Sequence, residues 1–68
     1  MISQEMLDLI DCLKYAEVSS DDSLAVCLLM NGKGQKIDEL SQYILDNKPT
    51  MGQILEKAVE LVGLLDKE

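Results

Sequence analysis

The sequence contains no histidine, arginine, tryptophan or phenylalanine, and the lack of histidine and arginine excludes several classes of function. Without histidine, no serine has the usual base that activates a nucleophile, and no structural zinc site has a plausible ligand set. Six lysines oppose 13 carboxylates, which gives a net charge of −7. Nucleic-acid binding requires a cationic patch, and this chain can assemble none of useful size. We therefore expect no catalytic residues, no metal or cofactor site, and no nucleic-acid ligand.

The sequence also has only two cysteines, one proline and no long apolar run. Cys12 and Cys27 are too few for a secreted disulfide scaffold, and their apolar neighbours predict packing in the core. The longest apolar run has seven residues, 24–30, too few for a membrane span. The carboxylate pairs lack the spacing of a calcium-binding loop. We expect a cytoplasmic protein with reduced thiols and no membrane contact.

Nearly half of the 68 residues are apolar, which is enough for the core of one small domain spanning residues 1–68. Three polar breaks, at 19–22, 31–34 and 47–50, divide the chain into four segments. In the first, third and fourth segments, apolar residues recur at the spacing of amphipathic helices. The sequence predicts an all-α fold: a small bundle of three to four short helices, at about 3–17, 21–31, 37–46 and 51–66.

Local signals support the helix ends. Ser3 and either Ser19 or Ser20 suit N-cap positions, and Thr50 with Gln53 has the spacing of a capping box. The second segment is the least certain, because its apolar run shows no helical periodicity and a strand with a hairpin at residues 31–32 remains the alternative. Leucine, alanine and methionine dominate the run, which favours a helix buried on every side or shared with a second chain.

The fourth segment has an apolar stripe wider than one neighbouring helix would cover. A domain of this size has little stability to spare, so oligomerisation is the remaining way to reinforce it. We therefore expect a homodimer that associates through this stripe. Its members are Met51, Ile54, Leu55, Ala58, Leu61, Val62 and Leu65.

Apolar side chains also interrupt the otherwise polar face of the first segment. Leu7 and Val18 lie close in angle on a helical wheel, Tyr15 lies further round, and Asp11 lies among them. Exposed apolar anchors, especially tyrosine, are typical of recognition surfaces. Leu7, Asp11, Tyr15 and Val18 are accordingly the predicted partner-binding residues, and packing against the following loop is the alternative.

The tripeptide Asp22-Ser23-Leu24, at the start of a predicted helix in an acidic chain, resembles the one on which acyl and peptidyl carrier proteins receive a phosphopantetheine arm. The resemblance covers three residues and implies Ser23 as the attachment site. A second alternative follows from charge: an acidic domain can mimic nucleic acid and act as a decoy that fills a basic groove.

The leading expectation is a non-enzymatic, acidic helical module that binds another protein. It would act as a regulator, inhibitor or adaptor by occupying a partner surface, and its small size and lysine-only basicity suggest an origin in bacteria or their phages. The carrier and decoy hypotheses remain the alternatives.

Overall fold

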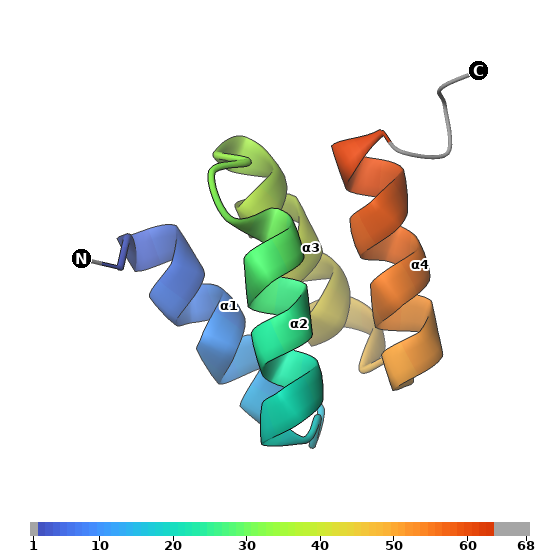
Figure 1. Ribbon diagram of the computed structural model, residues 1–68. Helices are drawn as coiled ribbons and strands as arrows, with labels where there is room; N and C mark the ends of the chain where they lie inside the picture. Colours follow the sequence, from blue (N-terminus) through green and yellow to red (C-terminus); the bar gives the residue numbers. More distant parts are fainter. Residues whose placement is uncertain (1, 64–68) are drawn as a thin grey trace.

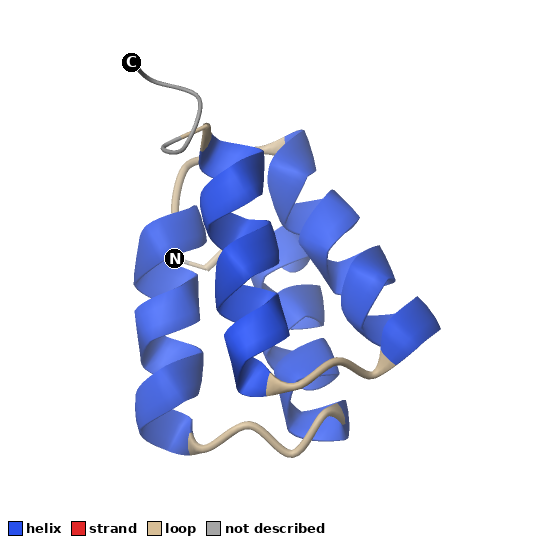
Figure 2. Ribbon diagram, turned by 90° about the vertical axis from the view of Figure 1, so that its right-hand side faces the viewer, coloured by secondary structure: helices blue, strands red, loops and turns tan. Residues whose placement is uncertain are grey.

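The computed structural model describes residues 2–63 as four α-helices, and this part of the chain contains no strand. The helices alternate in direction along the chain (Figure 1) and are joined by short connections (Figure 2). Their bounds are α1 Gln4–Tyr15, α2 Ser20–Met30, α3 Gln35–Asn47 and α4 Met51–Val62. The prediction of an all-α bundle is confirmed, and the strand alternative for the second segment is wrong. No helix within residues 2–63 combines the length and apolar character that a membrane span requires.

Side-chain caps fix the start of three helices, as the sequence predicts. The Met6 amide donates to Ser3 Oγ at 3.2 Å, and the Asp22 amide donates to Ser19 Oγ at 3.2 Å. At α4 the backbone amide of Gln53 donates to Thr50 Oγ1, and the backbone amide of Thr50 donates to the side-chain Oε1 of Gln53. These two bonds complete the capping box. These bonds satisfy donors that a helix leaves unpaired in its first turn.

Helix α4 ends at Val62, earlier than the position near 66 expected from periodicity. The reason is Gly63, which adopts a left-handed conformation with φ 79° and donates its amide to the carbonyl groups of Val59 and Glu60. A residue without Cβ adopts this conformation at little cost, and glycine is the usual helix terminator. Residues 64–66, and with them Leu65, lie outside the described part of the chain.

The four helices surround one core. Helix α1 packs against α3 and α2, and α4 packs against the same two helices from the other side. Helices α2 and α3, although consecutive in sequence, therefore lie diagonally across the bundle. All four contribute to the core, whose fully buried side chains include Leu9, Leu13, Val26, Met30, Leu40, Ile44 and Ile54.

Candidate functional site

Helix α2 leaves an apolar surface uncovered, because only Val26 and Met30 of its side chains are buried. Leu24 and Leu28 are 59% and 69% exposed, respectively. Beyond its first turn the helix carries no charged residue that would solvate this face. An apolar helix of this kind usually has a partner on its outer side.

An open groove lies between α1 and α2, with a volume of about 520 Å³. Two stripes of side chains line it at helical spacing: Met6, Ile10 and Lys14 from α1, and Leu24, Cys27 and Leu28 from α2. The sequence indicated that the second segment is apolar all round, but not that its uncovered side would meet a particular stripe of α1. That pairing depends on the packing angle of the two helices, which no local signal encodes.

Three of the four predicted partner-binding residues are exposed. Leu7, Asp11 and Tyr15 follow one another at intervals of four residues, so they form a stripe along the outer side of α1. The Lys48 ammonium lies 5.3 Å from the centre of the Tyr15 ring, which holds that ring against the end of α3. Val18 is half-buried and packs against the core, so the structure separates it from the other three.

The residues predicted for self-association divide between the core and the surface. Ile54 and Ala58 are fully buried within the monomer, and Met51, Leu61 and Val62 are half-buried against its core. Leu55 is exposed on the outer edge of α4. A contact with a second copy through this helix would therefore use Leu55 and the outer sides of its half-buried neighbours.

A second hollow, between α1 and α3, brings together carboxylates that are distant in sequence. Asp8 and Asp11 of α1 and Asp38 of α3 line it, next to Cys12 and Ser41. Within residues 2–63, no group of three or more carboxylate or thiol side chains is close enough to hold a metal ion. The hollow is thus an acidic surface feature between two helices.

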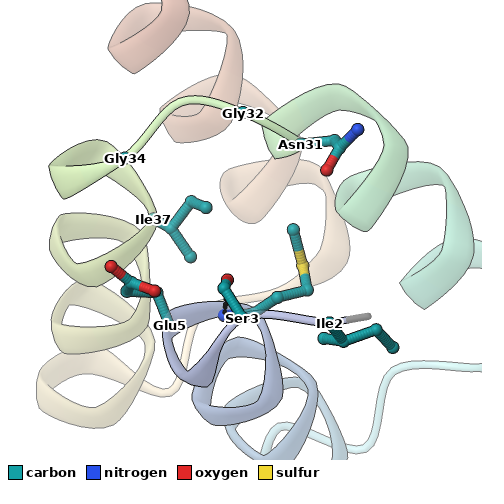
Figure 3. A pocket seen from close by; sticks show the side chains of 8 residues that line it. Ile2, Ser3, Glu5, Asn31, Gly32, Gly34 and Ile37 are labelled. Carbon is teal, nitrogen blue, oxygen red and sulfur yellow. Dashed lines mark hydrogen bonds between the residues drawn. The ribbon is translucent and has the colours of Figure 1, made fainter.

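A third hollow lies where the start of α1 meets the connection between α2 and α3 (Figure 3). Glu5 and Asn31 lie at its edges, and Ile37 lies between them. Ser3 also lines it, but its hydroxyl oxygen already accepts the capping hydrogen bond from Met6. Among residues 2–63, Glu5 is the only titratable side chain that lines this hollow, so these residues form no acid–base pair there.

Both thiols lie in surroundings that disfavour the thiolate. Burial raises the pKa of the Cys12 thiol; a hydrogen bond with Ser41 opposes this rise, and the charges of Asp8 and Asp11 add to it. Burial likewise raises the pKa of the Cys27 thiol. Since the thiolate is the reactive form, both cysteines are poor nucleophiles at neutral pH.

Replacing both cysteines, by Cys12→Ala and Cys27→Ala, is therefore expected to lower stability without abolishing partner binding. Cys12 is buried in the core and Cys27 is half-buried, so each loses packing contacts, at a cost of roughly 1 kcal/mol or more for the buried residue. Urea unfolding followed by circular dichroism measures the loss. Because Cys27 lines the groove between α1 and α2, a double variant that kept its stability but lost binding would indicate either a packing contact between Cys27 and the partner or a covalent or redox role.

Ser23 lies in the first turn of α2, where it is half-buried and faces the groove between α1 and α2. Its backbone amide donates to the Ser19 carbonyl at 2.8 Å, as expected for an ordinary residue of a first helical turn. Comparisons of this chain with protein-family models, curated proteins and solved structures gave no match.

Proposed function

We propose that this protein is a non-enzymatic interaction module that acts by occupying a surface of another protein, as a regulator, inhibitor or adaptor. The exposure of Leu24 and Leu28 on a helix with no polar face is the observation that carries the proposal. Full burial of a fully exposed leucine gains roughly 1.5–3 kcal/mol, and Leu24 and Leu28, which are 59% and 69% exposed, would each gain the larger part of that. A partner surface would supply that burial. A single exposed leucine, by contrast, is common on protein surfaces and would not indicate a partner.

The outer stripe of α1 supports the same function. Leu7 and Tyr15 are exposed apolar side chains with Asp11 between them, an arrangement that offers two anchors and one charge. Tyrosine is enriched among residues that dominate binding energy, because its ring buries a large area while its hydroxyl keeps a hydrogen-bond partner. Leu7 also lies next to Ile10 at the i, i+3 spacing, so the stripe adjoins the groove between α1 and α2.

Truncating Leu7 and Tyr15 to alanine is expected to weaken partner binding by about tenfold or more while changing stability little. Both side chains are about half exposed and lie outside the buried core, so the folded monomer loses few core contacts. The measurement compares affinity capture from lysate of the source cells by the parent and the double variant, with melting temperatures recorded in parallel.

The matched control is Leu45→Ala, because Leu45 on α3 is 49% exposed and Leu7 is 45% exposed. Equal capture by the parent and the double variant, accompanied by a large drop in melting temperature, would assign Leu7 and Tyr15 to the folded core and remove them from the binding surface.

A further inference from the structure

The groove between α1 and α2 is long, apolar and open. Its two lining stripes run along antiparallel helices, and α2 has 11 residues, which is about 16 Å or three helical turns at the usual rise. Ile10, Leu24 and Leu28 supply its apolar surface. A small molecule normally buries most of its surface in its site. The exposure of both leucines shows that this groove is too shallow for that, so its occupant must bring an extended apolar face of its own.

Charges around one end of the groove are predominantly negative. Of the residues that the structure describes, Lys14 is the only cation in the lining, and it lies at the end of α1 that connects to α2. Two exposed carboxylates lie beside this end: Glu17, whose backbone amide donates to the Lys14 carbonyl at 2.9 Å, and Asp21, which follows the groove-lining Ser20 in the first turn of α2. An occupant with cationic side chains beside its apolar stripe would complement this end of the groove.

The helices of the chain itself do not offer that combination. Of the six lysines, Lys14, Lys36 and Lys57 are the only ones within the described helices, one each in α1, α3 and α4. No described helix therefore presents a row of cations beside an apolar stripe. A second copy of this protein is a poor match for the charged end of the groove.

Resting on the function proposed above, we propose that the groove between α1 and α2 binds a cationic amphipathic helix of a partner protein. Apolar side chains at the i, i+3, i+4 and i+7 positions of that helix pack on Ile10, Leu24 and Leu28. Its lysine or arginine side chains face Glu17 and Asp21. The apolar groove gives the contact its affinity, and the carboxylates select the sign of the partner's charge.

A synthetic peptide tests the proposal directly. The probe is a peptide of about 14 residues in which leucine forms one helical face and lysine the other, and its counterpart replaces every lysine with glutamate. Fluorescence anisotropy measures affinity, and amide chemical-shift changes locate the binding site on the isotopically labelled protein. We expect saturable binding of the lysine peptide that weakens as salt increases, shift changes concentrated on α1 and α2, and much weaker binding of the glutamate peptide.

Three variants separate groove binding from general attraction to an acidic protein. Leu28→Ser should weaken binding of the lysine peptide about tenfold or more, because it removes the most exposed leucine of the groove. Leu45→Ser is the control on α3 and should bind like the parent. Lys14→Glu removes the lining cation and should tighten binding several-fold, a gain that general damage to the fold would not produce.

Several results would overturn this assignment: equal affinity for the two peptides, an unchanged affinity after Leu28→Ser or Lys14→Glu, or shift changes centred on α3 and α4. Concentration-dependent shifts of the same α1 and α2 amides without peptide would identify a second copy as the occupant instead. If the lysine peptide does not bind while affinity capture from lysate still depends on Leu7 and Tyr15, the groove is not the binding site, but the protein still functions by binding a partner. If the peptide does not bind and capture does not depend on Leu7 and Tyr15, the proposed interaction function is itself wrong.

Discussion

Replacing Leu40 with alanine is expected to leave most of the chain unfolded at 25 °C. Leu40 is fully buried on α3, the helix that packs against both α1 and α4. Truncating a buried leucine costs about 2–5 kcal/mol, because transfer energy is lost and a cavity remains. A domain of this size has roughly 3–5 kcal/mol in total from a single core. The cost is therefore comparable to the whole free energy of unfolding.

The matched control is again on α3. Leu45→Ala removes the same atoms from a half-exposed position and should shift the urea midpoint only slightly. Far-ultraviolet circular dichroism during urea titration measures both variants. Similar midpoints for Leu40→Ala and Leu45→Ala would mean that the core is reinforced by contacts beyond those within one monomer.

The helices could be predicted because their signals are local. Ser3, Ser19 and the pair Thr50 and Gln53 bind amides within three positions of themselves, so their spacing in sequence already determines the hydrogen bonds. Three segments also have apolar stripes at helical period, which identifies the side that packs inward. The largest difference is at the end of α4, where the left-handed conformation of Gly63 terminates the helix although the apolar pattern continues; the other predicted ends lie within two residues of the observed ones.

The arrangement of the helices and the groove could not be predicted, because α2 has no polar side. Its apolar run gives no indication that Val26 and Met30 point inward while Leu24 and Leu28 point outward. That choice follows from the contact of α2 with α4 on one side and α1 on the other. The contact of Val18 with the core could not be predicted either. Val18 lies beyond the end of α1, so a helical wheel of α1 does not give the direction of its side chain.

The wide apolar stripe of α4 leads to the second large prediction, that the parent protein sediments as a dimer at tens of micromolar. Leu55, Val59 and Val62 follow one another at the i, i+4 and i+7 positions on a side that the core leaves partly uncovered. The same stripe on a second copy can meet it in a two-fold symmetric contact. Since each copy carries a net charge of −7, the copies repel one another, and added salt should strengthen the dimer.

The variant Leu55→Asp tests this contact without removing a buried side chain, because Leu55 is 38% exposed in the monomer. Two aspartates placed near the symmetry axis would be desolvated without partners, at a cost of several kcal/mol that separation of the copies avoids. Leu61→Asp is a stronger perturbation, because Leu61 also packs against the monomer's own core, so it should give a monomer or an unfolded chain. Sedimentation equilibrium should show a folded monomer for Leu55→Asp and an undisturbed dimer for Leu45→Asp, which adds the same charge on α3. A parent that sediments as a folded monomer would show that the core of a single chain is sufficient, and would leave the apolar edge of α4 to a foreign partner.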